Sequence, residues 1–468
     1  MSDSTVNLTA LQGTCTSVFQ MFTFYESYIE TFYKERPWLI NAPFATQMEE
    51  LYRDGFCVMH VHAPQLINLG ARATWVVANC APSQVRWALE NNILIDPVDW
   101  KEQILRAQIA AFNPDVLYSL NPIDFDSKFI RSLTKRPKAV IGWRAADIPA
   151  HVDWGDFDLI VSHLSVCREQ ALRIGAKSSA YFHPCVPTFL GDITTSTLRE
   201  FDVVFAGQWT PQHHHRNLII NAVAEASERE GFSFGLFLSS NGQELPPAVS
   251  RCNRGARWGL QMYRALKSGR IVLNAEIDLA KGEAGNLRLF ETTAVGSFLL
   301  TEYQLNIERY FTPNKHIDTY SSIPELLEKI RFYLKHDELR EQMALASQAH
   351  VRSEFSLGIG ARKLLEFSDT IIKTKAVTQT PSTAVDQALG QLRAGNVSAA
   401  LLIVEQITDL SRPVKDLEFV RGICFGQLAR FDEAARALEQ ELALFPDNPP
   451  ARDLLDYVKS ELGRPQRT

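Results

Sequence analysis

The chain has 468 residues, 46% of them hydrophobic and 22% charged, which is ordinary for a folded protein and long enough for more than one domain with a large core. Its formal net charge of −6 argues against a protein that binds nucleic acid by neutralising phosphates, but it leaves room for a local basic cleft. Seven cysteines are scattered without a Cys-x-x-Cys pair, so the sequence suggests neither a zinc site nor a disulfide framework and favours a reducing compartment.

The N-terminal segment gives no sign of export. Residues 1–12 carry no periodic pattern, and the polar N-terminus lacks the basic stretch and apolar core of a signal peptide. No stretch of the chain approaches the roughly 20 apolar residues that a membrane-spanning helix needs. We therefore expect a cytoplasmic protein without a transmembrane segment, for which peripheral attachment to the inner face of the membrane stays open.

The first part of the chain alternates short apolar strands with helices. Residues 18–33 start like a strand and continue as a helix, and the alternation becomes regular from Thr74 onward. The candidate strands are 75–79, 116–119, 139–143, 159–162 and 179–182, and the candidate helices are 83–90, 100–112, 125–133 and 167–174. Near-continuous apolar strands joined by helices predict a parallel sheet covered on both faces. We expect a Rossmann-like domain over residues 1–185.

A second series of the same kind follows a short hinge. Residues 186–200 combine prolines with a Ser/Thr cluster and have no clear period, which is typical of a hinge. Alternating strands and helices then predict a second Rossmann-like domain over residues 201–372. Two such domains in tandem turn the C-terminal ends of their strands toward a shared crevice, where ligands bind in sheets of this kind. Arg144 and Asp147, after the candidate strand 139–143, would also face that crevice.

The stretch 285–301 carries the strongest functional signal. It predicts a loop, a short helix with one apolar face, a left-handed stop at Gly296 and a buried strand. The start of such a helix presents backbone N–H groups that have no acceptor within the helix, so the turn before it can cradle a phosphate. Those groups belong to Gly285, Asn286 and Leu287. Glu291 lies in the apolar stripe, where a carboxylate is costly unless a polar group such as a ribose diol meets it.

The same stretch resembles the C-terminal signature of the GT-B glycosyltransferases, most closely the group with a CgeB-like (glycosyl transferases group 1) C-terminal domain. The pattern N-x-R-x-F-E-x-x-A-x-G runs from Asn286 to Gly296, and a strand ending in Thr301 follows it. An E-L-x-x-K-I helix at 325–330 and an S-E-F-S element at 353–356 continue the match. The resemblance implies an α/β fold of GT-B architecture, with two Rossmann-like domains around a deep cleft and a closing helix over 356–372 that crosses back onto the first domain.

The resemblance also implies roles for two carboxylates. In retaining relatives the glutamate that matches Glu291 holds the nucleotide ribose, and a carboxylate eight positions earlier meets the donor sugar. Glu283 stands at that spacing, although its neighbours do not show the fuller pattern of those relatives. If both glutamates have these roles, the transfer retains the anomeric configuration. Either one would also be at home as a solvated acid near a helix start.

Basic side chains near the predicted crevice can balance the charge of a diphosphate. Arg216 and Arg288 are the first candidates, because guanidinium groups pair phosphate oxygens bidentately, and Lys281 is the third. The resemblance places a His/Arg pair at the start of the helix after the first strand of the second domain, so His215 joins Arg216 there. Gly207, at the end of that strand, lets the backbone approach a phosphate or a sugar.

We expect neither a metal nor another cofactor beside the nucleotide-sugar substrate. The adjacent histidines at 213–215 cannot converge on one ion without unusual backbone, and no carboxylate partner is evident near them. No Asp-x-Asp motif stands in a suitable place. Backbone N–H groups and arginines would then stabilise the departing diphosphate.

The first domain is expected to face the acceptor. Tyr25 and Tyr28 resemble the loop after the first strand that faces the acceptor in this group, although aromatic core packing would explain either residue. His60 and His62 lie on one face if their segment is extended. Inverting GT-B relatives use a histidine of this domain as a general base, which makes His62 a second catalytic candidate beside Glu283. The choice between retention and inversion stays open.

The last part of the chain differs in kind. Residues 373–382 are polar and typical of a linker, and residues 383–468 predict a small all-helical tail. Ala400 and Ala434 lie 34 residues apart, which is the tetratricopeptide period, so the tail resembles one good and one degenerate repeat. We expect it to pack on the body of the protein, on another copy or on a protein partner.

The leading hypothesis is a glycosyltransferase that moves a sugar from a nucleotide-diphosphate sugar to a hydroxyl of a glycan or protein. A sugar-nucleotide epimerase on the same scaffold is an alternative, but it needs a denser set of acids and histidines in the cleft. A catalytically silent scaffold that binds a partner through the repeats is a third hypothesis, and the intact stretch 285–296 argues against it. The donor base, its sugar and the acceptor stay open.

Overall fold

The computed structural model describes residues 16–193, 197–240, 242–378, 381–405, 407 and 413–462. The unpatterned residues 1–12 and parts of the expected hinge and linker, 194–196 and 379–380, lie outside the described residues. The chain divides into two compact units, Met1–Ser368 and Asp369–Thr468. The first unit, called the body below, holds both sheets, and the second unit is the tail. Among the described residues, no helix is long and apolar enough to cross a membrane.

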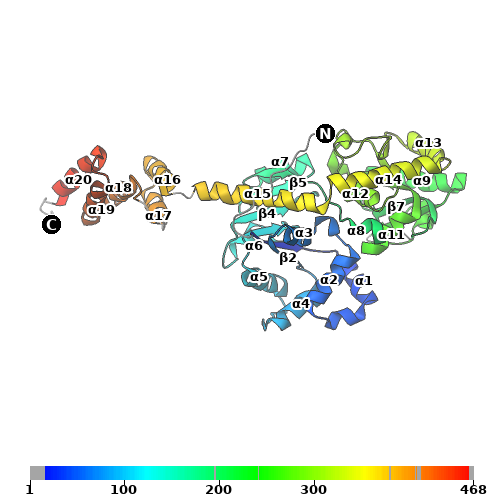
Figure 1. The fold of residues 1–468 in the computed structure, drawn as a ribbon, viewed down its shortest axis with the longest axis horizontal. Helices are drawn as coiled ribbons and strands as arrows, with labels where there is room; N and C mark the ends of the chain where they lie inside the picture. The colour runs from blue at the N-terminus through cyan, green and yellow to red at the C-terminus, as the bar shows by residue number, and fades with distance from the viewer. Residues whose placement is uncertain are drawn as a thin grey trace, which may run out of the picture. The chain divides into compact units, whose positions relative to one another are not determined.

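The first lobe of the body is a six-stranded sheet in the order β2-β1-β3-β4-β5-β6, and every neighbouring pair is parallel. The strands are β1 (Ser17–Phe22), β2 (Arg72–Val77), β3 (Val116–Ser119), β4 (Ala139–Trp143), β5 (Leu159–Ser162) and β6 (Ser179–Tyr181). The helices are α1 (Glu26–Glu35), α2 (Phe44–Asp54), α3 (Ala63–Asn68), α4 (Ala81–Glu90), α5 (Trp100–Phe112), α6 (Ser127–Arg131) and α7 (Ser165–Arg173). The expected parallel sheet with crossover helices is confirmed (Figure 1).

The second lobe is a five-stranded parallel sheet in the order β11-β10-β9-β7-β8. The strands are β7 (Phe201–Gln208), β8 (Phe234–Ser239), β9 (Gly269–Asn274), β10 (Leu299–Glu302) and β11 (Asp318–Tyr320). The helices are α9 (His214–Glu230), α10 (Pro247–Cys252), α11 (Gly259–Ser268), α12 (Leu287–Ala294), α13 (Ile323–Tyr333) and α14 (Asp337–Glu354). The predicted two-sheet α/β class is therefore confirmed.

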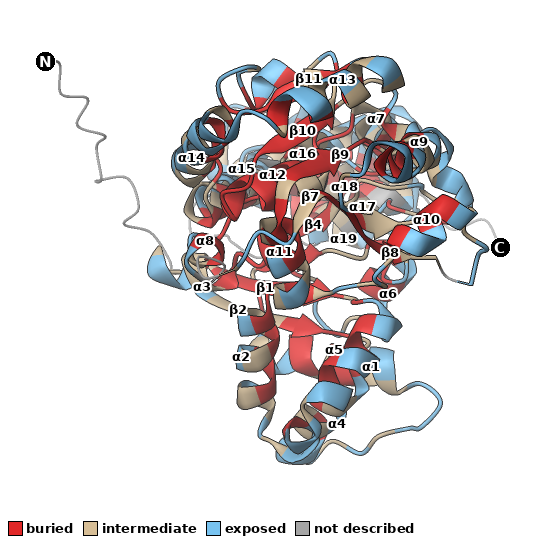
Figure 2. Cartoon of the chain, turned by 90° about the vertical axis from the view of Figure 1, so that its right-hand side faces the viewer, coloured by how far each residue is buried: buried red, intermediate tan, exposed pale blue. Residues whose placement is uncertain are grey.

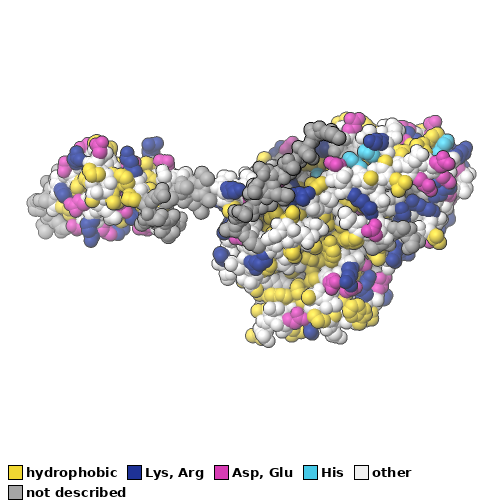
Figure 3. Space-filling view, in the orientation of Figure 1, with side chains coloured by type: hydrophobic (Ala, Val, Ile, Leu, Met, Phe, Trp, Pro, Cys, Tyr) yellow, Lys and Arg dark blue, Asp and Glu magenta, His cyan; other side chains and the backbone are white. Residues whose placement is uncertain are grey.

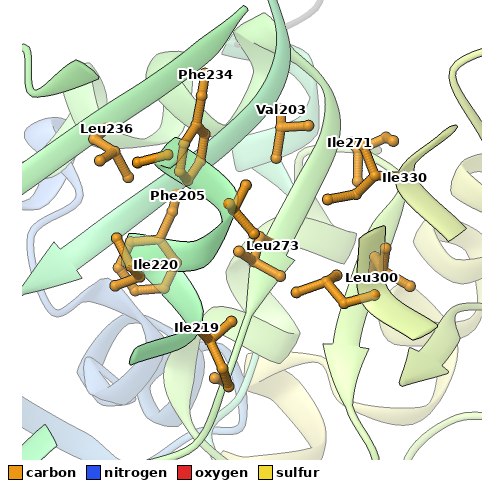
Figure 4. Packing of buried hydrophobic residues seen from close by; sticks show 14 of the residues in the cluster. Val203, Phe205, Ile219, Ile220, Phe234, Leu236, Ile271, Leu273, Leu300 and Ile330 are labelled. Atoms are coloured by element: carbon orange, nitrogen blue, oxygen red, sulfur yellow. The ribbon is translucent and has the colours of Figure 1, made fainter. Parts of the chain in front are cut away.

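The sheets are buried because their strands carry apolar side chains on both faces. Figure 2 shows most strands of both lobes buried and the outward faces of the covering helices exposed; the edge strands β2 and β6 are only partly buried. In the second lobe, side chains of β7, β8, β9 and β10 pack against Ile219 and Ile220 of α9 and Ile330 of α13 (Figure 4). Such two-sided burial makes the sheet rigid, so the loops at its C-terminal edge have a firm support.

The two lobes are tied together behind the sheets. After β6, the connection contains α8 (Phe189–Ile193), and Val186 pairs with Ser356 at the end of α14. The following helix, α15 (Leu357–Thr378), runs from the second lobe along the first lobe (Figure 1). Gly360 of α15 packs so closely on His62 and Cys185 that a side chain there would collide with both. The helix predicted to cross back is therefore present.

Two local expectations were wrong. The segment with His60 and His62 is not extended: a 3-10 helix covers Val58–His60 and α3 begins at Ala63, because Pro64 suits the first turn of a helix. The helix α15 also runs to Thr378, six residues beyond its expected end and into the predicted linker. The residues there are polar, but lysine and alanine are good helix formers, so polarity alone did not mark a break.

The tail is a set of five helices, α16 (Pro381–Arg393), α17 (Val397–Glu405), α18 (Leu417–Gln427), α19 (Phe431–Leu444) and α20 (Pro449–Leu462). Gly422 lets α18 approach α19, since a Cβ there would lie 2.6 Å from Cγ of Leu438. The buried Glu441 accepts hydrogen bonds from the backbone N–H of Asp416 and the side-chain amide of Asn448. The all-helical tail is confirmed, and its assignment as tetratricopeptide repeats stays a prediction.

Candidate functional site

Two adjoining cavities lie between the lobes, where the C-terminal ends of the strands meet. The small cavity has a volume of about 190 Å³ and an apolar wall, and the large cavity has a volume of about 760 Å³ and many charged residues. Aromatic and thioether side chains of the small cavity are Phe56, Phe237, Trp258, Met262 and Tyr263. Titratable side chains of the large cavity include Asp147, His163, His213, Arg216, Glu276 and Asp278. Both cavities are lined by Tyr25, Gly207, Gln208, Leu287 and Arg288.

The loop and helix that separate the two cavities form as the sequence predicted. The side chain of Asn286 accepts a hydrogen bond from the N–H of Leu289, which caps α12, and Gly296 ends the helix with a φ of +66°. Gly285 has a φ of +147°, a conformation that favours glycine. The first N–H groups of α12 have no acceptor within the helix. The helix therefore points its positive end at the large cavity, which Asn286 and Leu287 line.

Glu291 lines the small cavity and is only 6% exposed. Its carboxylate accepts a hydrogen bond from the guanidinium of Arg288 at 2.7 Å, which answers the cost of placing an acid on the apolar face of α12. Burial raises the pKa of Glu291, and the neighbouring charge of Arg288 opposes that rise. The acid is therefore turned into the space between the lobes, together with a cation that lines both cavities.

Arg216 supplies a second guanidinium to the large cavity and is 7% exposed. One of its terminal nitrogens donates to the carbonyl of Gln208 at 2.7 Å, while its buried Nε has no hydrogen-bond partner within the described part of the chain. Burial, with the charge of Arg288, lowers the pKa of Arg216 to about 10. Two cations thus repel each other beside an empty space and a helix start, an arrangement that an anion would relieve.

Glu276 was not predicted from the sequence. It lies two residues beyond the end of β9, is 5% exposed and lines the large cavity. Its Oε1 accepts hydrogen bonds from the N–H of Gly285 at 3.1 Å and of Asn286 at 3.3 Å. Burial raises its pKa to about 7, although those two hydrogen bonds act in the opposite direction. Its place just after a buried parallel strand is the signal that would have pointed to it.

His163 is the second residue that the sequence did not single out. It follows β5 directly, its ring is buried against Gly285, and its Nδ1 has no hydrogen-bond partner among the residues that the structure describes. Burial lowers its pKa to about 3, so the ring is neutral at physiological pH. The indole Nε1 of Trp143, at the end of β4 and also in the large cavity, is likewise buried without a partner. Buried polar atoms without partners around one cavity indicate a missing polar ligand.

Several predicted residues lie away from the two cavities. The carboxylate of Glu283 accepts a hydrogen bond from the N–H of Ser165 at 2.6 Å, so it ties the second lobe to α7 of the first. The ring of His215 lies 2.6 Å from a carboxylate oxygen of Glu302, and His213, which bonds the hydroxyl of Thr210, lines the large cavity in its place. Consecutive helix residues point in different directions, so only one of the adjacent histidines can face the cavity.

Lys281 is exposed, has a left-handed backbone conformation in the loop before α12, and lines neither cavity. His62 is 0% exposed beneath α15 and lies outside both cavities. Like Glu283 and His215, these two residues line neither cavity. A histidine enclosed on all sides cannot reach an acceptor hydroxyl, which must approach from the crevice.

The two predicted tyrosines of the first lobe, Tyr25 and Tyr28, lie in different surroundings. Tyr25 is 53% exposed and lines both cavities, with its ring near those of Phe56 and Trp258. Tyr28 is buried, and its hydroxyl donates to Asp54 at 3.0 Å beside a third, outer cavity. Only Tyr25 therefore stands where a ligand of the large cavity would meet the first lobe.

The positive charge of the site is local. On the face seen in Figure 3, basic and acidic side chains are interspersed over both lobes. Within the part of the chain that the structure describes, no group of three or more His, Cys, Asp or Glu side chains is placed to hold a metal ion. The large cavity is lined by Arg144, Arg216 and Arg288, together with the start of α12, and Arg257 lines the small cavity.

Comparisons with known proteins bear on the second lobe most directly. Residues 215–366 match a family model described as glycosyl transferase-like, a segment that includes Arg216, Glu276, Arg288 and Glu291. The search of curated proteins gave no match.

Many solved structures match this chain at low sequence identity. A glycosyltransferase from Rickettsia africae ESF-5 is 13% identical, with 76% of this chain and 99% of that chain covered and a TM-score of 0.48. A sucrose-phosphate synthase from Thermosynechococcus elongatus is 9% identical, with 77% and 100% covered and a TM-score of 0.48. The Anabaena protein HepE in complex with UDP and glucose is 11% identical, with 76% and 100% covered and a TM-score of 0.48.

The family match covers most of the stretch on which the resemblance was first based, and the two facing parallel sheets supply the architecture that the resemblance implied. Residues 215–366 thus match a glycosyl transferase-like domain, and the body of the chain has the two-sheet α/β architecture that the resemblance implied.

Proposed function

We propose that the protein transfers a sugar from a nucleotide-diphosphate sugar to a hydroxyl group of a glycan or protein inside the cell. The donor spans the two adjoining cavities, and the acceptor enters the large cavity from the side of the first lobe. The observation that carries this proposal is the shared wall of the cavities, where Glu291, Arg288 and the start of α12 follow one another along a single helix.

The nucleoside occupies the small cavity. Its apolar wall of Phe237, Trp258 and Met262 suits the faces of a base, because stacked rings and thioethers bury such a surface well. Glu291 stands at the inner end of this wall, and its carboxylate can accept both hydrogen bonds of a ribose diol while Arg288 holds it in place.

The diphosphate lies where the two cavities join. Arg288 lines both cavities, Arg216 lines the large cavity, and the positive end of α12 begins at Leu287, which lines both. The predicted cradle is smaller than expected, because the N–H groups of Gly285 and Asn286 donate to Glu276. Negative charge that develops on the leaving diphosphate would meet two fixed cations and a helix start, so the environment stabilises the transition state without rearranging. Gly207 lines both cavities, and a Cβ there would lie 3.0 Å from the ring of Phe205, which lines the large cavity.

The sugar then extends into the large cavity, between the two lobes. His163 and Trp143 offer polar atoms without partners on the side of the first lobe, and Tyr25 lies at the entrance that an acceptor would use. The acceptor hydroxyl would approach the anomeric carbon from this side. The anomeric configuration of the product decides between retention and inversion.

A panel of nucleotide sugars in a thermal-shift assay tests the proposal. A ligand at about 100 times its dissociation constant stabilises the folded state by about 2.7 kcal/mol, which moves the unfolding temperature by several degrees. We expect one base to stand out, and both the nucleoside diphosphate and its sugar conjugate to shift the protein. No shift with any nucleoside diphosphate, followed by no binding in calorimetry, would sink the proposal.

The residues around the large cavity are also compatible with the epimerase hypothesis. Glu276, Asp278, His163 and His213 around the large cavity are a denser set of acids and histidines than the sequence indicated. Incubation with the preferred nucleotide sugar alone distinguishes the two activities, because an epimerase forms a new sugar nucleotide without an acceptor. A transferase leaves the donor unchanged or slowly hydrolyses it.

A further inference from the structure

Glu283 and Glu276 are the two candidates for the acid that contacts the donor sugar, and they lie in different surroundings. Glu283 has the spacing of the retaining relatives, but its carboxylate accepts the N–H of Ser165 and lies outside the cavity lining. Glu276 stands seven residues earlier, lines the large cavity and is 5% exposed. The acid that faces the proposed sugar position is therefore the one that spacing alone does not select.

The carboxylate of Glu276 is fixed at one oxygen and open at the other. Oε1 accepts the N–H groups of Gly285 and Asn286, directly before α12, and this pair of hydrogen bonds fixes the rotation of the group. Among the described residues, Oε2 has no hydrogen-bond partner. Above pH 7 the carboxylate is ionised and has about four acceptor positions. A carboxylate that is 95% buried and has an unused oxygen beside a cavity then needs a hydrogen-bond donor, which a ligand can supply.

The charges around Glu276 decide which part of the ligand meets it. A phosphate would be repelled by the carboxylate and attracted to Arg216 and Arg288, while sugar hydroxyls are hydrogen-bond donors. The groups that face Glu276 electrostatically are Arg216 of α9, Glu302 of β10, Tyr310 and Tyr320. Arg216 attracts the diphosphate to its own side of the cavity, whereas the other groups near Glu276 are an acid and two hydroxyls. The ligand should therefore bind with its sugar toward Glu276.

We propose that Glu276 is the carboxylate that accepts hydrogen bonds from the donor sugar, and that it selects neutral sugars over acidic ones. This inference rests on the proposed function. By holding the N–H groups of Gly285 and Asn286, Glu276 also sets the loop that aims the start of α12 at the diphosphate. A uronic acid in the same place would bring a second carboxylate against Oε2, which costs binding free energy. Glu283 instead fastens the lobes to each other.

Calorimetry with matched ligands tests the role of Glu276. For a uridine donor the probes are UDP, UDP-glucose and UDP-glucuronic acid, and for a guanosine donor they are GDP, GDP-mannose and GDP-mannuronic acid. Glu276→Gln keeps the shape of the side chain and one acceptor for the loop. We expect this variant to bind the nucleoside diphosphate within about threefold of the wild type and the neutral nucleotide sugar about tenfold or more weakly, since hydrogen bonds to charged groups are strong. Glu283→Gln is the control and should weaken both ligands equally or neither.

The acidic sugar gives a measurement that does not depend on how well the variant folds. The wild type should bind the nucleotide uronic acid at least tenfold more weakly than the neutral nucleotide sugar. In Glu276→Gln the ratio of these two dissociation constants should be smaller. Equal losses for the nucleoside diphosphate and its sugar conjugate in Glu276→Gln, or a wild type that accepts the uronic acid equally well, would overturn the inference. A wild type that binds none of the nucleoside diphosphates overturns the proposed function itself, and this inference with it.

Discussion

Replacing Arg216 by methionine should make the protein more stable and its diphosphate binding weaker. Burial and the charge of Arg288 lower the pKa of Arg216 from 12.5 to about 10, which corresponds to about 3 kcal/mol against the charged form in the folded protein. The substitution removes that cost and fills the same space, but it loses the hydrogen bond to the carbonyl of Gln208, worth about 1 to 2 kcal/mol. We expect a net gain of about 1 to 2 kcal/mol in the free energy of unfolding.

Chemical denaturation and calorimetry measure the two effects separately. Loss of a guanidinium that pairs with a phosphate should weaken nucleoside diphosphate binding by about 10-fold to 100-fold, while binding of the uncharged nucleoside should hardly change. Arg340→Met is the matched control, because Arg340 is buried in the same lobe but bonds to Asp337 and to the carbonyl of Tyr333. It should destabilise the protein by about 2 kcal/mol and leave binding intact. An Arg216→Met variant that is destabilised and binds diphosphate normally would refute the reasoning.

Three further predictions concern the same site. Glu291→Gln should lower the preference for a ribonucleoside diphosphate over its 2′-deoxy analogue, from about tenfold to near none, in competition binding; an unchanged preference would mean that Glu291 does not meet the ribose. Gly285→Ala should cost several kcal/mol in chemical denaturation, because its Cβ would lie 2.6 Å from the ring of His163, whereas Gly231→Ala meets nothing within 4 Å and should cost only the backbone strain of about 1 kcal/mol; equal costs would speak against a tight contact between the lobes. The pKa of Glu276 is raised from 4.5 to about 7, so the folded state binds its proton more tightly, and stability should be greatest below pH 4.5 and fall as pH rises through 7 by about 3 kcal/mol from this group; Glu276→Gln should remove that part of the slope in denaturation curves taken from pH 5 to 8, and a slope that persists would place its origin elsewhere.

Local patterns in the sequence were enough to predict the elements that carry the proposed diphosphate site. The capping asparagine Asn286, the apolar stripe of α12 and the stop at Gly296 are all short-range signals, and each element formed as expected. Arg216 and Arg288 could be placed in the crevice because strands of a parallel sheet all end at the same edge. Glu291 was noticed because an acid on an apolar face is anomalous on its own.

The rest of the site depends on tertiary contacts that spacing does not encode. The eight-residue separation led from Glu291 to Glu283, but the loop between β9 and α12 turns Glu283 toward Ser165 and brings Glu276 to the cavity. His163 carries no local anomaly, because a polar residue at the end of a strand is common. Its importance comes from Gly285 of the other lobe, which packs against its ring.

The last helix of the body has a consequence for how the polypeptide reaches its native state. Gly360 on α15 seals His62 and Cys185, so the first lobe is completed by residues that leave the ribosome long after its own sheet. Until then the nascent first lobe exposes an apolar seam, where a chaperone would be expected to bind. A first lobe produced as a separate fragment should aggregate unless residues 357–368 are supplied as a peptide or joined to it through a tether.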